Sequence, residues 1–102
     1  MKIGDYVRTD KGTIDKLTRE NIMTYEVALM GFGEKPIKSS SNIIDLIQVG
    51  DYVNGLKVQE VNNEIKGFGT IVFDKDTSIM EDYIYSIVTK EQFSQMEYKI
   101  GD

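Results

Sequence analysis

Two copies of one short pattern decide the fold: Ile3-Gly4-Asp5-Tyr6-Val7 and Val49-Gly50-Asp51-Tyr52-Val53. A shortened copy, Lys99-Ile100-Gly101-Asp102, closes the sequence. In each full copy, Gly-Asp favours a turn and Tyr-Val favours an extended strand. The repeat predicts two related β units, residues 1–48 and 49–102, within one compact domain.

Each full copy is followed by a turn signal and a second strand. Asp10-Lys11-Gly12 precedes a strand at residues 13–17, and Asn54-Gly55 precedes one at residues 56–61. Asn-Gly is typical of a two-residue type I′ hairpin turn, because both central residues of that turn need positive φ. The sequence therefore predicts that each unit opens with a hairpin.

Other segments are predicted from alternation and from capping signals. Further strands are expected at residues 22–29, 70–73 and 79–88, with Met23, Tyr25, Val27 and Leu29 on the buried face of the first. Ser39 to Asn42 is expected to cap a single helical or 3₁₀ turn at residues 43–46. Thr89 with Gln92 three residues later fits a capping box, which predicts one short helix near residues 90–97.

The fold class that follows is mainly β with one short C-terminal helix. Two arrangements remain open, an SH3-like small barrel or two packed β units derived from the internal repeat. In the first half of the chain, the expected strand order with a 3₁₀ turn before the last strand is that of an SH3-like barrel. The Gly-Asp-Tyr-Val opening also resembles the start of KOW-type SH3-like barrels.

Composition excludes most common enzyme designs. The chain has 102 residues with no His, no Cys and no Trp. Thiolate or imidazole catalysis, disulfides and His- or Cys-ligated metal sites are therefore absent. We expect a protein that is not an enzyme and needs no cofactor. Asp74-Lys75-Asp76-Thr77-Ser78 has the opening of an EF-hand loop, but Ile79 and Tyr85 stand where that loop needs Gly and Glu.

Charge and hydropathy favour a soluble cytoplasmic protein with a basic protein partner. The net charge is −5, with only Arg8 and Arg19 as arginines. Binding to nucleic acid depends on clustered cations, so direct nucleic-acid binding is disfavoured. No apolar run approaches the length of a membrane span, and Met1 to Asp5 does not begin a signal peptide.

Nine residues are candidates for partner binding, and each is weighed against a purely structural role. Tyr6 and Tyr52 either line a peptide groove or are half-buried strand residues. Phe32 and Phe68 lie between glycines in loops or bulges and can stack on a partner. Four acidic residues are expected to form a negative patch at one end of the sheet, or else a solvated edge: Asp74, Asp76, Glu81 and Asp82. Arg8 is the remaining candidate.

Three segments resemble small uncharacterised proteins of Firmicutes phages and prophages. They are residues 2–9, residues 42–55 without Gln48, and residues 87–93. The resemblance implies an accessory protein in the host bacterial cytoplasm that binds and inhibits a host immunity protein, as anti-CRISPR proteins do. It transfers no site residue.

Other functions are kept beside this one. An oligomeric sponge for a signalling nucleotide would contact phosphate or base through Arg8, Arg19 or the Gly-Phe-Gly loops. An SH3-like adaptor, a nucleic-acid-binding module and a structural phage component are the remaining alternatives, and a homo-oligomer is compatible with several of them.

Overall fold

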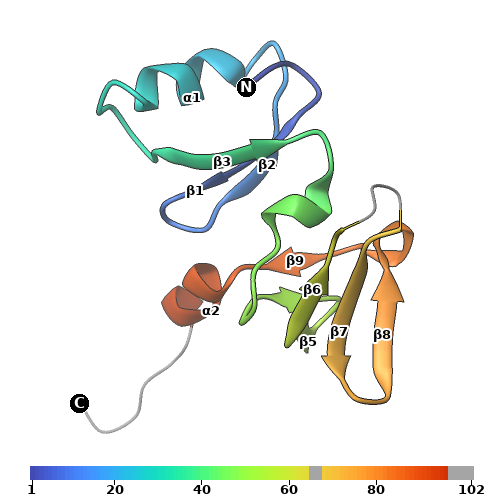
Figure 1. Cartoon of the computed structure of the whole chain (residues 1–102). Coiled ribbons are helices and arrows are strands. Elements are labelled where there is room, and N and C mark those ends of the chain that lie inside the picture. Colours follow the sequence, from blue (N-terminus) through green and yellow to red (C-terminus); the bar gives the residue numbers. More distant parts are fainter. Residues whose placement is uncertain (65–67, 97–102) are drawn as a thin grey trace, which may run out of the picture.

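The structure is a computed structural model that describes residues 1–64 and 68–96 (Figure 1). These residues form a mainly β protein with nine short strands, two α-helices and two 3₁₀ turns. In chain order the elements are β1 (Tyr6–Thr9), β2 (Ile14–Lys16), α1 (Ile22–Ala28), β3 (Pro36–Ser40), η1 (Ile43–Leu46), β4 (Tyr52–Val53), β5 (Leu56–Lys57), β6 (Glu60–Asn62), β7 (Thr70–Asp74), β8 (Thr77–Met80), η2 (Glu81–Tyr83), β9 (Ile87–Val88) and α2 (Lys90–Met96).

The strands form three antiparallel sheets of three strands each. Their orders are β2-β1-β3, β5-β4-β9 and β6-β7-β8. Figure 1 shows the first sheet beneath α1, and the other two sheets on the opposite side of η1. Within the described residues the sheets are not joined into a closed barrel.

Both copies of the repeat form the same local structure. Gly4 N–H donates to Leu17 O at 2.9 Å, and Gly50 N–H donates to Val58 O at 3.0 Å. The return bonds, Leu17 N–H to Asp5 O and Val58 N–H to Asp51 O, are both 2.7 Å. The two glycines have φ of 95° and 99°, a conformation that side chains with a Cβ rarely adopt. Each Tyr-Val then begins the central strand of its own sheet.

The predicted turns and the capping box before α2 are confirmed, whereas Asn42, the N-cap residue of η1, makes no side-chain capping hydrogen bond. Asn54 and Gly55 have φ of 53° and 84°, as a type I′ turn requires. Residues 43–46 form the 3₁₀ turn η1. Thr89 N–H donates to Gln92 Oε1 at 3.1 Å, and Gln92 N–H donates to Thr89 Oγ1 at 3.3 Å, so the capping box starts α2.

The strand predicted at residues 22–29 is wrong, because this segment contains helix α1. Alternation over so few residues also fits a helical period, and here Tyr25 and Ala28 face inward while Met23 and Val27 are exposed. Leu29, which follows the helix, is exposed too. The buried face predicted for Met23, Tyr25, Val27 and Leu29 is therefore also wrong.

The turn that precedes helix α1 is fixed by bonds that sequence reasoning missed. Thr18 N–H donates to Asn21 Oδ1 at 2.8 Å, and Asn21 N–H donates to Thr18 Oγ1 at 3.3 Å. Ile22 N–H then donates to Thr18 O at 3.0 Å. Asn21 is the N-cap residue of α1, but its side chain bonds within this turn and makes no capping hydrogen bond to the helix.

Two other predicted strands are interrupted. The segment 79–88 divides into the end of β8, the 3₁₀ turn η2 and strand β9. The segment 56–61 divides into β5 and β6 around Val58, which is buried in the core. The end of the helix predicted near 90–97 falls on residue 97, outside the described residues.

The main core is formed by the second unit together with Ile44 of η1 and Ile47 at the end of the first unit. Its buried residues are Ile44, Ile47, Val53, Val58, Ile71 and Phe73. A Cβ at Gly69 would meet Ile44 Cδ1 at 2.4 Å, so this glycine lets β7 approach η1 closely. Because η1 follows β3 directly in the chain, the core of the second unit also fixes the position of the first sheet.

Candidate functional site

A cleft lies where the two units meet. It has a volume of about 430 Å³ and opens to solvent. Its lining comes from β1 and β2, from η1, and from the segment that runs from η2 to β9: Tyr6, Ile14, Ile43, Glu81, Ile84, Tyr85, Ser86 and Ile87. We call this the junction cleft.

The side chain of Asn54 positions one wall of the junction cleft. Its Nδ2 donates to Tyr83 O at 2.9 Å. Its Oδ1 accepts from Tyr85 N–H at 2.9 Å and from Ser86 N–H at 3.1 Å. Glu81 N–H also donates to Gly69 O at 3.1 Å. The type I′ turn thus holds the backbone of residues 83–86, and Tyr85 remains 82% exposed beside the cleft.

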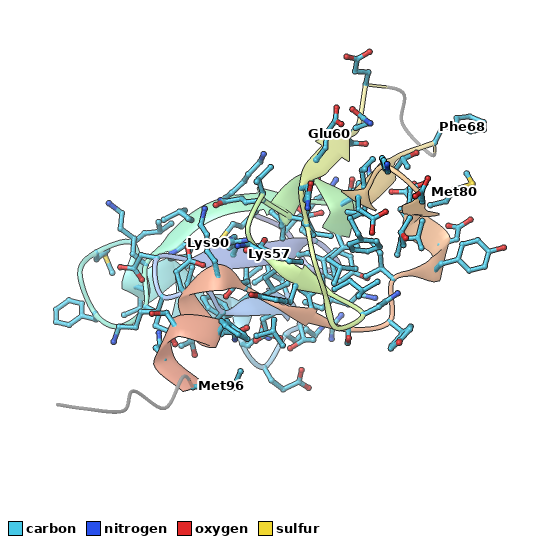
Figure 2. The ribbon with its side chains drawn as sticks, turned by 90° about the horizontal axis from the view of Figure 1, so that it is seen from below. Lys57, Glu60, Phe68, Met80, Lys90 and Met96 are labelled. Atoms are coloured by element: carbon cyan, nitrogen blue, oxygen red, sulfur yellow. The ribbon has the colours of Figure 1, made fainter. Side chains whose placement is uncertain are left out.

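Aromatic, apolar and acidic side chains gather around this wall. Tyr83 is 69% and Phe68 is 68% exposed. Thr70 pairs with Met80, so the loop that carries Phe68 and the end of β8 lie at the same end of the third sheet. Figure 2 shows Phe68 and Met80 near each other there. Glu81 lines the cleft and the neighbouring Asp82 is exposed.

One wall carries a cation. Lys16 Nζ lies 5.8 Å from the centroid of the Tyr6 ring, and the two residues are directly opposed in β1 and β2. At an exposed position such a contact contributes about 0.5–1 kcal/mol. The cleft therefore combines a tyrosine already paired with a cation on the first unit and an acidic, aromatic wall on the second.

The acidic candidates do not form one patch. Asp74 and Asp76 lie at the turn between β7 and β8, where Asp76 N–H donates to Asp74 Oδ1 at 2.7 Å. Glu81 and Asp82 follow the far end of β8, a strand about 13 Å long. The patch expected at one end of the sheet is therefore two acidic pairs at opposite ends.

The remaining candidates are distributed over the chain. Phe32 is exposed in the loop after α1. Tyr52 is half-buried and stacks on Phe93 with ring centroids 4.2 Å apart. Arg8 is completely buried, so its guanidinium faces protein groups instead of solvent. The structure thus brings Tyr6, Phe68, Glu81 and Asp82 to the region of the junction cleft.

Arg8 belongs to a buried ion pair that joins the two units. Its Nη1 donates to Asp51 Oδ2 at 2.5 Å and its Nη2 donates to Asp51 Oδ1 at 3.0 Å. Nη1 also donates to Leu46 O, and Nη2 donates to Glu91 Oε2 at 2.8 Å. Burial lowers the pKa of Arg8, but the bonds and charges of Asp51 and Glu91 outweigh it and raise this pKa.

Sequence reasoning missed Asp51 and Glu91 as partners of Arg8. Asp51 also accepts the N–H groups of Gln48 and Lys90, at 2.7 and 3.0 Å, so it ties β1, the start of β4 and the start of α2 together. No spacing rule points to this cluster, because Arg8 and Asp51 are 43 positions apart.

Two polar contacts in the first unit shift pKa values. Burial, followed by the hydrogen bond donated to Asp15 Oδ2 at 2.9 Å, raises the pKa of Tyr25 to about 12. Hydrogen bonds from Thr13 and Thr9, at 2.7 and 2.9 Å, lower the pKa of Glu34. Both contacts fix the segments on either side of α1.

The described residues present neither a metal-binding cluster nor a helix suited to span a membrane. They contain no group of three or more His, Cys, Asp or Glu side chains placed to hold a metal ion. No helix in the described part of the chain combines the length and apolar character of a membrane span.

Comparison of the chain with known protein families, with curated proteins and with solved structures finds no match. The function is therefore argued from the chain's own residues.

Proposed function

We propose that this chain is a non-enzymatic binding protein whose junction cleft takes a basic segment of a partner protein. The observation that carries this proposal is the acidic, aromatic wall of the cleft, formed by Glu81 and Tyr85 beside the exposed Tyr83 and Asp82. Arg and Lys side chains pair with carboxylates and stack on tyrosine rings, so both features of the wall select the same ligand chemistry.

The expected affinity is modest because the wall is solvent-exposed. Each exposed ion pair contributes about 0.2–1 kcal/mol, and each cation–π contact contributes about 0.5–1 kcal/mol. Three or four such contacts sum to at most about 4 kcal/mol, and the small apolar lining, which includes Ile43 and Ile84, adds little, so the binding is expected to be weak. Binding of this kind weakens with added salt.

The finer fold assignment within this proposal is SH3-like. The strand order expected in the first half is not found, because residues 22–28 form α1 and β4 pairs with β5 and β9 instead of β1, so the assignment is proposed for the second unit. Its support is the order of elements: β4 and β5 open as a hairpin, β6 to β8 form a meander, η2 follows, and β9 returns to pair with β4. In SH3-like barrels a 3₁₀ turn likewise precedes the last strand, which pairs with the first. Small β modules of this kind are used for peptide recognition.

The biological side of the proposal rests on charge and on resemblance. A net charge of −5 favours a basic partner, and the resemblance to phage accessory proteins makes a host protein the proposed target. Inhibition follows when the bound segment is one that the host protein uses to contact nucleic acid. The phage and anti-immunity role therefore depends on the binding proposal.

Binding is tested with a fluorescein-labelled peptide of alternating arginine and proline, titrated with the chain at low and high salt. The double variant Glu81→Lys/Asp82→Lys is expected to weaken binding at least 10-fold. The matched control is Asp74→Lys/Asp76→Lys, which makes the same change in net charge at the other end of β8. Equal losses in both variants would show that net charge alone attracts the peptide and would refute the site.

The inhibitory role is tested in bacteria that carry an active immune system. Expression of the wild-type chain is expected to raise phage plating efficiency, and the Glu81→Lys/Asp82→Lys variant is expected to lose this effect. If the variant raises plating efficiency as much as the wild-type chain does, inhibition does not depend on the junction cleft.

A further inference from the structure

Strand β3 forms an open edge of the first sheet. It pairs with β1 on one side and is the outermost strand in the order β2-β1-β3. A groove of about 310 Å³ follows this edge, lined by Pro36, Ile37, Lys38 and Ser39 of β3 and by Met1 and Leu29. We call it the β3 groove. It lies outside the junction cleft and shares no lining residue with it.

The groove presents both features that an added strand needs. An edge strand has backbone N–H and C=O groups directed away from its sheet, and an extended peptide pairs with them. Ile37 and Leu29 are 52% and 53% exposed and give apolar surface for alternate side chains of that peptide. The occupant that fits is therefore an extended segment.

The charges around the β3 groove select an acidic segment. Lys38 lines the groove, Lys35 immediately precedes β3, and Lys2 adjoins the lining residue Met1, with all three lysines exposed. The acid next to Lys35, Glu34, is directed toward the hydroxyls of Thr9 and Thr13. Asp10, an exposed acid, adjoins Lys35 because its N–H donates to Lys35 O at 2.9 Å, so the cationic character of the groove rests on Lys38, the charged side chain in its lining.

A second copy of the same chain fits this edge poorly. Lys38 is the middle residue of β3, so two β3 strands paired antiparallel in the register that pairs all five residues would place Lys38 directly opposite Lys38 of the other copy. Like charges in directly opposed strand positions are destabilising. The same lysine attracts a strand that carries carboxylates.

We propose that the β3 groove binds an extended acidic segment of a partner protein, which adds to the first sheet as a strand beside β3. This goes beyond the proposed function, because it assigns a second site with the opposite charge preference. The chain would then hold a basic segment at the junction cleft and an acidic segment at β3.

The test uses a short fluorescein-labelled peptide of alternating valine and glutamate, titrated with the full chain by fluorescence anisotropy. Binding is expected, together with slower amide hydrogen exchange in β3. Lys38→Glu is expected to weaken binding about 5-fold or more, because an attraction becomes a repulsion. The matched control is Lys57→Glu, which changes an exposed lysine on β5 in a different sheet (Figure 2).

Three comparisons separate this proposal from its alternatives. A peptide N-methylated at alternate residues is expected to lose binding, because it cannot pair with the edge. Equal binding of a valine and lysine peptide would overturn the charge assignment. Concentration-dependent dimerisation that Ile37→Lys abolishes would show that a second copy occupies the groove, and that result would overturn the proposal.

Discussion

Replacing Asp51 with alanine is expected to destabilise the protein far more than the same replacement at Asp5, its counterpart in the repeat. Both residues follow the glycine that opens a unit, and both backbones make equivalent hydrogen bonds. Their side chains differ, because the carboxylate of Asp51 is fully buried against Arg8 whereas Asp5 is half-exposed. Comparing the two variants therefore separates the stability contributed by the buried Asp51 carboxylate from that contributed by the turn.

The magnitude follows from what Asp51→Ala leaves behind. Arg8 keeps a buried charge, and the N–H groups of Gln48 and Lys90 lose their acceptor. Removal of one partner from a buried ion pair costs about 3–5 kcal/mol. A chain of this length has a total stability of about 5–15 kcal/mol, so the loss is a large fraction of it. Asp5→Ala is expected to cost less than about 1 kcal/mol.

Thermal and urea unfolding, each followed by far-ultraviolet circular dichroism, measure both variants. Asp51→Ala is expected to melt at least about 12 °C below wild type, since each kcal/mol shifts the midpoint by about 4–8 °C at this size. If Asp51→Ala does not fold, Asp51→Asn keeps the side-chain volume and is expected to lose about 2–3 kcal/mol. Equal unfolding midpoints for the alanine variants at Asp51 and Asp5 would refute this reasoning.

Three further predictions concern the first unit. In urea unfolding, Gly12→Ala is expected to lower the free energy of unfolding by about 3–5 kcal/mol and Gly4→Ala by about 1–2 kcal/mol. Both glycines have positive φ, but only at Gly12 would the new Cβ meet a neighbouring side chain, Thr89 Oγ1 at 2.2 Å. Tyr25→Phe is expected to remove a tyrosinate absorbance transition near pH 12. Because folding raises the pKa of Tyr25, the stability that this residue contributes is present below its ordinary pKa and is lost as the pH rises toward about 12. Glu34→Gln is expected to flatten the acid side of a plot of melting temperature against pH; the lowered pKa of Glu34 stabilises the fold above its ordinary value of 4.5, and that stability disappears as the pH falls through the folded pKa. A parallel acid limb in wild type and Glu34→Gln would contradict the last of these.

The features predicted well from sequence are those that a few adjacent residues determine. Asn54-Gly55 sets its own turn because both residues adopt positive φ, and Thr89 with Gln92 caps α2 through two bonds within one turn. The repeated Gly-Asp-Tyr-Val likewise specifies one local geometry twice. Each of these predictions needed no knowledge of what packs against the segment.

The features predicted wrongly depend on contacts between distant segments. The segment 22–29 shows alternation, yet its apolar Met23 and Val27 face solvent on α1, so the pattern does not report a buried strand face. Arg8 was a candidate for partner binding from its type and its strand position. Its partner Asp51 lies in the other unit, and nothing near Arg8 in the sequence indicates that burial.

The residue after Tyr-Val explains how one repeat yields two different functions within the fold. In the first unit this residue is Arg8, which reaches Asp51 at the start of the next unit and locks the two units together. In the second unit it is Asn54, which bonds residues 83–86 of its own unit and so forms the wall of the junction cleft. The backbone bonds of the two copies are the same, so the different side chain at this position gives each copy its own contacts, and in the second unit those contacts hold residues 83–86 beside the unit boundary. The cleft draws on both outcomes, because Tyr6 lines it from the first sheet and the bond from Arg8 to Asp51 joins that sheet to the second unit.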